Sequence, residues 1–227
     1  MQRSSHDPIH RCPLSTNRPV RRGRGHRHAG CRQTVDACSS RIGAIATHAR
    51  INPYLGIDGL ELLRRRLAAV DVAELLQRSD PLIQTRQFAV LDMAGRAVAF
   101  TGTDCPDWAG HREAEGFSVQ GNRLAGPRVV DAAAESLQHT AEQEELDLAA
   151  RLVAALEASE AAGGDVKGEE SATIYVVDTE DYPLWDIRVD LHDDPVAELR
   201  RLHDVFRERL LDKILAMPTR RHPAGTL

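Results

Sequence analysis

The sequence predicts a layered α+β domain. Short apolar stretches typical of strands occur in groups, and between them lie longer stretches whose apolar residues recur every three to four positions. Such grouping indicates helices packed on sheets, although periodicity alone does not separate α+β from α/β. The length of 227 residues suits one domain of ordinary size. Because only 4% of residues are aromatic, we expect Leu, Val, Ile and Ala to fill the core.

The first forty residues differ from the rest of the chain. They contain eight arginines, no lysine and only two acids, so they carry a net charge of +6. The whole chain carries −5, which leaves −11 for residues 41–227. Prolines and an Arg/Gly/His run interrupt this segment, and its apolar residues have no period, so we expect an irregular basic segment. The acidic body argues against nucleic-acid binding, which needs a basic surface.

Three of the four cysteines, Cys12, Cys31 and Cys38, lie in the same segment. No C-x2-C pair occurs, so we expect neither a zinc site nor any other metal or cofactor. No stretch approaches the roughly 18 apolar residues of a membrane span. The arginine-rich start also lacks the apolar core of a signal peptide. We therefore expect a cytoplasmic protein with no membrane partner, in which a disulfide framework is unlikely to form.

The first half of the domain is expected to contain strands, two short helices and a hairpin. Strands are predicted at residues 42–47 and 117–122, and a hairpin at residues 88–101 with its turn at 93–96. The helix starts are predicted from two capping-box patterns, Asp58 with Glu61 and Asp71 with Glu74.

The second half is expected to contain three helices and two strands. Their predicted ranges are 127–137 and 144–161 for two helices, 171–177 and 184–192 for the strands, and a last helix from Asp194. Asp194 suits an N-cap, and Pro195 suits the first helical position. In residues 184–192 apolar and polar residues alternate, which is typical of a strand with one buried face.

Five segments together resemble the bacterial family called domain of unknown function 1028. They occur in the family's order and cover nearly all of residues 41–227. The segments are IGAIATHARINPYLGIDGLELL, QFAVLDMAGRAVAFTGTDCPDWAGH, GFSVQGNRLAGPRVVDAAAES, AAGGDVKGEESATIYVV and DIRVDLHDDPVAELRRL. We therefore expect the domain to occupy residues 41–216, followed by a tail at 217–227.

The resemblance implies a four-layer α-β-β-α sandwich of the N-terminal-nucleophile (Ntn) hydrolase type. In that class the first residue of the mature chain, Thr, Ser or Cys, attacks an amide carbonyl while its own α-amine acts as the base. The resemblance thus implies a possible hydrolase of small amides or peptides. The alternative is a non-catalytic ligand-binding or scaffold protein on the same fold.

The chain departs from the family at its start. Neither of the family's first two strands nor its N-terminal nucleophile is recognisable in residues 1–40. One hypothesis is that residues up to about Ser40 come from a shifted reading frame, since GC-rich codons for residues 16–30 can be chosen that encode a family-like strand one nucleotide later. Loss of two strands would leave sheet edges unpaired, so we expect self-association and allow for a homo-oligomer.

Two rows of polar residues alternate along predicted strands. The rows are Ser118, Gln120 and Asn122, and Asp186, Arg188, Asp190 and His192. One interpretation is that they line a cleft between the sheets, with Asn122 as the oxyanion donor and Gln120, Asp190 and His192 as binding residues. The other interpretation, which we favour, is a solvated edge or a salt-bridged row.

The densest group of reactive side chains spans residues 101–111. Cys105 is a candidate nucleophile with His111 as its base, and Thr101 and Trp108 are candidate binding residues. A buried, inert Cys105 beside a structural Trp108 is the favoured alternative, because free cysteines are commonly buried. Asp165 is predicted to hold a tight turn or, less favoured, to contact a ligand.

Overall fold

The computed structural model of the chain describes residues 36–143 and 145–226 as a mixed α+β domain. The strands are β1 (Asp36–Ser39), β2 (Gly43–Ala49), β3 (Arg86–Asp92), β4 (Ala97–Thr101), β5 (Trp108–Ala114), β6 (Phe117–Leu124), β7 (Ala172–Val177) and β8 (Pro183–Val189). The α-helices are α2 (Pro53–Arg64), α3 (Ala69–Ser79), α4 (Pro127–Ala141), α5 (Leu148–Ala161), α6 (Pro195–Arg209) and α7 (Leu211–Leu215). No helix within these residues is both long enough and apolar enough to cross a membrane.

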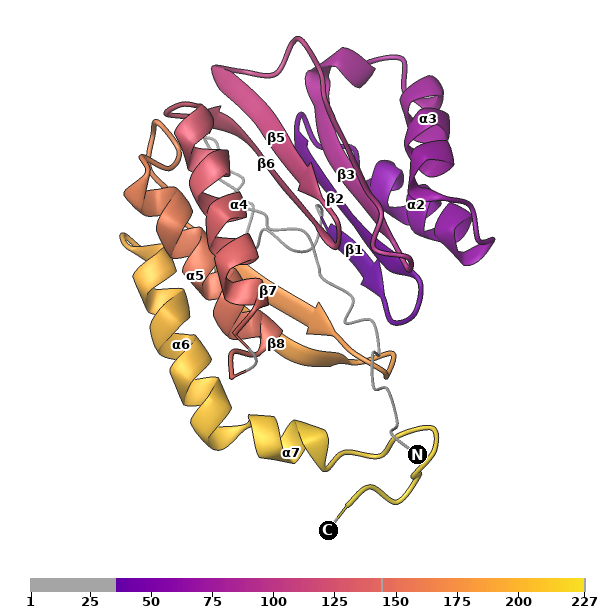
Figure 1. Cartoon of the computed structure of the whole chain (residues 1–227), viewed down its shortest axis with the longest axis vertical. Helices are drawn as coiled ribbons and strands as arrows, with labels where there is room; N and C mark the ends of the chain where they lie inside the picture. The colour runs from indigo at the N-terminus through magenta and orange to yellow at the C-terminus, as the bar shows by residue number, and fades with distance from the viewer. Residues whose placement is uncertain (1–35, 144, 227) are drawn as a thin grey trace, which may run out of the picture.

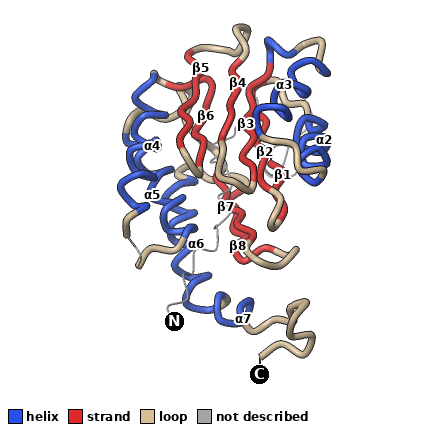
Figure 2. The backbone as a smooth tube through the Cα atoms, turned by 45° about the vertical axis from the view of Figure 1, so that its right-hand side comes forward, coloured by secondary structure: helices blue, strands red, loops and turns tan. Residues whose placement is uncertain are grey.

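All strand pairs in the described part of the chain are antiparallel. Strands β1 to β4 form one sheet in chain order, and β5–β6 and β7–β8 form two separate hairpins. Helices α2 and α3 cover one face of the four-stranded sheet, and the β5–β6 hairpin faces its other side (Figure 1). Helix α4 packs on β5–β6, and α5 and α6 pack on β7–β8. Figure 2 shows α7 and the segment after it extending beyond this body.

Two apolar cores hold these layers together. One lies between the four-stranded sheet and helices α2 and α3, where Ile45, Phe88 and Val90 are fully buried. The other joins both hairpins to helices α4, α5 and α6 and contains Trp185. Since successive strand residues point to opposite faces, the residues next to Ile45 and Phe88 face the β5–β6 hairpin. Several of these are alanines, whose small side chains allow the two layers to approach closely.

The predicted starts of the first two helices are wrong. Helix α2 begins at Pro53, because the Asn52 side chain accepts a hydrogen bond from the Tyr54 N–H at 3.1 Å and proline suits the first helical position. Asp58 therefore lies inside the helix. Helix α3 begins at Ala69, whose N–H donates to the Asp92 carboxylate at 3.1 Å. This cap comes from the end of β3, so local sequence does not reveal it.

Strand β1 corrects the prediction of an irregular segment through residue 40. Residues 36–39 pair with β2 along its whole first half, from Asp36 opposite Ala46 to Ser39 opposite Gly43. An edge strand can form from an unpatterned sequence when its neighbour supplies the hydrogen-bonding partners. Strand β5 was also not predicted, because residues 108–114 lack a clean alternation of apolar and polar side chains.

The other predicted elements are confirmed, with small shifts at their ends. The strand at 42–47, the hairpin at 88–101 and the strands at 117–122, 171–177 and 184–192 are all present. Helix α6 begins as predicted, since the Asp194 side chain accepts from the Ala197 N–H at 3.1 Å. Helix α5 begins four residues later than predicted, at Leu148, because Asp147 caps it through the Ala150 N–H at 2.8 Å.

Candidate functional site

Polar side chains meet between the four-stranded sheet and the β5–β6 hairpin. We call this group the inter-sheet polar cluster; it consists of Gln87, Thr101, His111, Gln120 and Asn122. The first two come from β3 and β4, and the other three come from β5 and β6. They face each other because their strand neighbours, such as Phe88 on β3 and Val119 on β6, are buried in the two helix-covered cores.

Gln87 is the centre of the inter-sheet polar cluster and is completely buried. Its amide nitrogen lies 2.8 Å and 3.1 Å from the carbonyl oxygens of Gly121 and Gly110 and 3.0 Å from the Thr101 hydroxyl, so its two hydrogens serve three acceptors. Its amide oxygen accepts from Asn122 Nδ2 at 3.1 Å. The register of β5–β6 shifts between Trp108 and Gly110, and bulges of this kind leave ladder carbonyls in need of another partner. Gln87 supplies that partner from the opposite layer.

Thr101 and His111 form a hydroxyl–imidazole pair across the two layers. The Thr101 Oγ1 lies 2.8 Å from His111 Nδ1. Because Gln87 already donates to this oxygen, the hydroxyl hydrogen of Thr101 is available to the ring nitrogen. We therefore assign Nδ1 as the acceptor of this hydrogen bond, which places the ring proton on Nε2. Both side chains are half-buried, so the pair lies at the border of the buried cluster.

Gln120 of the inter-sheet polar cluster and two side chains beside the cluster, those of His48 and Ser118, are buried without a complete set of partners. His48, Ser118 and Gln120 are only 1%, 2% and 4% exposed. Among the described residues, neither ring nitrogen of His48, nor Ser118 Oγ, nor Gln120 Oε1 has a hydrogen-bond partner. Gln120 Nε2 does donate, to the Ala46 carbonyl at 3.3 Å. Each unpaired buried polar group costs about 1–3 kcal/mol of stability. A molecule that supplies hydrogen-bond partners to these atoms removes that cost when it binds.

Burial without a partner also changes the acidity of His48. Burial lowers the pKa of His48 from 6.5 to about 4, because the charged imidazolium loses its hydration. Between pH 6.5 and 4, the His48 imidazole is therefore protonated in the unfolded chain but not in the folded protein. The stabilisation from His48 is therefore fully present above pH 6.5 and is lost as the pH falls toward 4.

We expect the free energy of unfolding of the wild-type protein to fall by roughly 2–3 kcal/mol through His48 between pH 7 and 4.5. The measurement is urea denaturation at both pH values. His48→Gln is expected to remove this part of the pH dependence, whereas His139→Gln, at an exposed helical position, is expected to keep it. An equal pH dependence in the wild-type protein and His48→Gln would contradict the assignment.

The second polar row lies away from the inter-sheet polar cluster. Asp190 is exposed next to β8, where it forms an ion pair with Arg188 at 2.8 Å. His192 is also exposed, and its Nδ1 lies 3.0 Å from the Asp194 N–H. The structure therefore brings Gln120 and Asn122 together with Thr101 and His111, but it does not bring Asp190 or His192 to them.

The remaining candidate residues have contacts of other kinds. The Cys105 thiol donates to the Arg86 carbonyl at 3.3 Å, and its pKa is raised by burial and also by the nearby Asp104. A raised thiol pKa opposes nucleophilic attack. Trp108 packs against the core of the two hairpins. Asp165 holds a turn by accepting from the Lys167 N–H at 2.8 Å.

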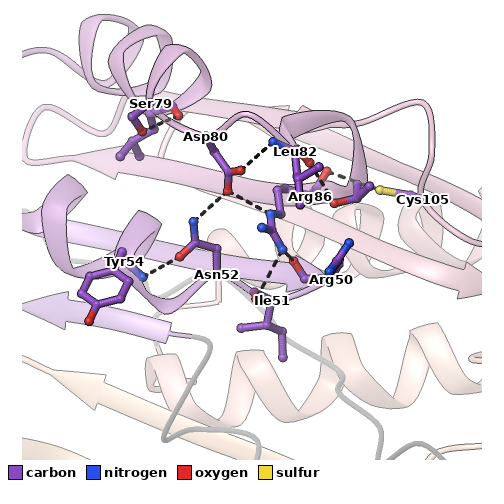
Figure 3. Close-up of polar contacts among 11 residues, drawn as sticks. Arg50, Ile51, Asn52, Tyr54, Ser79, Asp80, Leu82, Arg86 and Cys105 are labelled. Atoms are coloured by element: carbon purple, nitrogen blue, oxygen red, sulfur yellow. Dashed lines mark hydrogen bonds and ion pairs between the residues drawn. The ribbon is translucent and has the colours of Figure 1, made fainter.

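Cys105 belongs to a second polar network, at the junction of β3 with helices α2 and α3. Figure 3 shows the Arg86 guanidinium between the Asp80 carboxylate and the backbone carbonyls of Arg50 and Ile51. Asn52 donates to the same carboxylate at 2.7 Å. Through these contacts Arg86 and Asp80 link the start of β3 to the end of α3 and to the segment before α2.

Two residues of the polar layer, His48 and Gln87, were not singled out from the sequence. His48 stands near the end of the mostly apolar strand GAIATHA, and Gln87 stands near the start of the strand RQFAVLD. The sequence feature that could have identified them is their position in the strands, because His48 lies on the strand face opposite to that of Ile45, and Gln87 lies on the face opposite to that of Phe88. No three His, Cys, Asp or Glu side chains are grouped for a metal ion anywhere in residues 36–143 and 145–226.

Comparison with known proteins places residues 27–199 in one family. The family model described as "Family of unknown function (DUF1028)" matches residues 27–199. The chain belongs to this family. Its match begins before β1, so this DUF1028 domain includes residues on the N-terminal side of residue 41. None of the curated proteins matches the chain.

A solved structure supports the same assignment. The crystal structure of protein SPO2555 from Silicibacter pomeroyi, described with family model DUF1028, is similar to this chain with a TM-score of 0.76 and 26% sequence identity. The similarity covers 86% of this chain and 84% of that one. The two DUF1028 proteins therefore share most of their architecture.

Proposed function

We propose that this DUF1028 protein binds a small, uncharged amide or peptide in the layer between its four-stranded sheet and the β5–β6 hairpin. We further propose that its fold is the four-layer α-β-β-α sandwich of Ntn hydrolases. The order of helices α2 and α3, the four-stranded sheet, the two hairpins and helices α4 to α6 in Figure 1 supports this second part.

The observation that carries the proposal is the set of unpaired polar atoms of His48, Ser118 and Gln120. A hydroxyl and a neutral imidazole each donate and accept, and the Gln120 oxygen accepts. An amide group offers both an N–H donor and a carbonyl acceptor, so it matches this set.

The proposed ligand is uncharged because the polar side chains between the four-stranded sheet and the β5–β6 hairpin offer it no opposite charge. Gln87, Gln120, Asn122, Thr101 and Ser118 are neutral. The lowered pKa keeps His48 neutral at pH 7 as well. A charged ligand would lose its hydration here without gaining an opposite charge, which is costly.

Hydrolysis of the bound amide is a second candidate function. The hydroxyl–imidazole pair of Thr101 and His111 supports it, since an activated hydroxyl is what amide hydrolysis by acyl transfer needs. A scaffold role without catalysis accounts for the fold but not for the unpaired polar atoms.

Saturation-transfer NMR tests the binding proposal with two matched probes. The probes are N-acetyl-alanine amide, which is uncharged, and N-acetyl-alanine, which is an anion at pH 7. We expect the uncharged probe to bind at least about tenfold more tightly, the factor that corresponds to one lost hydrogen bond or about 1.4 kcal/mol.

Two glutamine variants locate the binding. Gln120→Leu is expected to abolish the signal, because it removes the unpaired acceptor while keeping a similar volume. Gln138→Leu, at an exposed position of α4, is expected to keep it. Thermal unfolding checks that both variants are folded. Absence of binding to the folded wild-type protein, or unchanged binding in folded Gln120→Leu, would reject the proposal.

A further inference from the structure

The geometry points to Thr101 and His111 as a catalytic dyad, in which the Thr101 hydroxyl attacks a carbonyl carbon and His111 acts as its general base. The inference rests on the proposed function, because it needs a carbonyl-bearing ligand between the sheets. It concerns a nucleophile within strand β4 and not an N-terminal one.

The first support is the hydrogen-bond geometry. The distance of 2.8 Å between Thr101 Oγ1 and His111 Nδ1 lies within the range for direct proton transfer between a nucleophile and its base. Gln87 Nε2 lies 3.0 Å from the same oxygen and is a donor only, so the hydroxyl hydrogen of Thr101 has the ring nitrogen as its acceptor. A hydroxyl that donates to a neutral ring nitrogen is in the state from which attack starts.

The second support is how firmly the Thr101 side of the dyad is held. Gln87 is itself held by four contacts, to Thr101, Gly110, Gly121 and Asn122. Gln87 and Thr101 are also direct partners in the β3–β4 ladder. A nucleophile on paired strands, locked by a buried amide, needs little reorganisation before reaction.

The third support is access. Gln87 is fully buried, whereas Thr101 and His111 are half-buried. A ligand seated against the unpaired groups of Gln120 and Ser118 lies on the same inter-sheet side, because His111 is the direct ladder partner of Gln120. The dyad and the unpaired groups of Gln120 and Ser118 therefore share one side of the β5–β6 hairpin.

The reaction is a balanced acyl transfer. The Thr101 oxygen forms a bond to the carbonyl carbon, and its proton moves to His111 Nδ1. The bond from that carbon to the leaving nitrogen or oxygen then breaks, and the leaving group takes the proton from His111. Water next gives a proton to His111 and attacks the acyl ester, and Thr101 leaves with that proton restored.

The test uses the full chain and p-nitrophenyl acetate, an activated ester that requires no specific leaving-group contacts. Release of p-nitrophenolate is followed by absorbance, and the acetylated residue is located by peptide mass spectrometry. We expect an acetyl group on the peptide that contains Thr101. Thr101→Val is expected to abolish this acetylation, because valine has no oxygen to acetylate, and His111→Ala is expected to slow it about 100-fold or more, the usual contribution of a general base.

Matched variants separate chemistry from folding. Thr101→Ser keeps a hydroxyl and is expected to retain acetylation at position 101. His139→Ala and Thr103→Val change exposed residues outside the dyad and are expected to behave as the wild-type protein does. Thermal unfolding is measured for each variant.

The outcomes distinguish this inference from the proposed function. Binding of N-acetyl-alanine amide without acetylation of Thr101 overturns the dyad and leaves the binding proposal standing. Acetylation that does not depend on His111 in a folded variant also overturns the dyad. Acetylation that depends on both Thr101 and His111 supports the dyad. If acetylation shows this dependence but N-acetyl-alanine amide does not bind, the dyad stands and only the proposed ligand is rejected.

Discussion

Replacing Arg86 with methionine is expected to lower the free energy of unfolding by about 3–5 kcal/mol, because the change leaves a buried carboxylate without its cation. The Asp80 side chain is 4% exposed, and its oxygen Oδ2 lies 2.9 Å from Arg86 Nε. Methionine keeps much of the apolar volume of the arginine stem. The expected loss in the free energy of unfolding therefore comes from the unpaired Asp80 carboxylate and not from a large cavity.

The surroundings of Asp80 explain why the loss is large. Burial by itself raises the pKa of Asp80, but hydrogen bonds from Asn52, from the Leu82 N–H and from Arg86 outweigh it, so the pKa is lowered overall. The carboxylate is thus charged at neutral pH. Arg86 also donates to the carbonyls of Arg50 and Ile51 (Figure 3), which lose this donor in the variant.

Urea denaturation at pH 7 measures the effect. The matched control is Arg78→Met, because Arg78 forms an ion pair with Glu74 in which both side chains are more than half exposed. Exposed pairs of this kind contribute about 0–1 kcal/mol. A loss below about 1 kcal/mol in Arg86→Met would show that the buried pair is not needed for stability.

Trp185→Ala is expected to lower the free energy of unfolding by about 3–5 kcal/mol, the usual range for a buried aromatic residue. Trp185 is 1% exposed. Its ring stacks between His203 and Phe206 of α6, with centroid distances of 4.9 Å to each. The alanine variant leaves a cavity between β8 and α6 that these rings do not fill.

Leu191→Ala is the control for this second prediction, since Leu191 follows β8 closely but is 66% exposed. We expect it to change stability by less than about 0.5 kcal/mol. Trp185→Phe is expected to fall between the two, because it keeps one aromatic ring in the stack. Equal stabilities of Trp185→Ala and Leu191→Ala would mean that α6 does not depend on this contact.

Much of the fold follows from local sequence patterns. The alternation in β8 correctly places Trp185, Ile187 and Val189 on one buried face, but Leu191, which was expected on the same face, lies beyond the strand and is 66% exposed. Asp194 and Pro195 correctly mark the start of α6. These predictions succeed because the relevant contacts lie within a few residues along the chain.

Other elements depend on contacts that local patterns do not contain. Helix α3 is capped by Asp92, which lies 23 residues after Ala69 in the sequence. Strand β1 has no recognisable pattern and is defined by its pairing with β2. In both cases the partner that stabilises the element is distant in sequence, so only the folded chain reveals it.

The candidate site was predicted in part. The row of Ser118, Gln120 and Asn122 was identified by its alternation, and Thr101 and His111 were chosen as reactive residue types. The structure joins these two groups through Gln87, which the sequence did not distinguish from an ordinary strand residue. Cys105, for which the inert alternative was favoured over a nucleophile, contacts the Arg86 carbonyl.

The sequence by itself determined the family, most of the strands and helices, and which residues share a face of a strand. It did not determine which polar face is buried. The polar rows of β6 and β8 have the same alternation, yet Gln120 is 4% exposed whereas Asp190 lies in water. The tertiary structure decides the difference, because the four-stranded sheet covers the inner face of β6, while the polar row of β8 stays exposed. The physical reason is that alternation tells which face of the strand a side chain lies on. Whether that face is covered and kept from water depends on elements that are distant in the sequence.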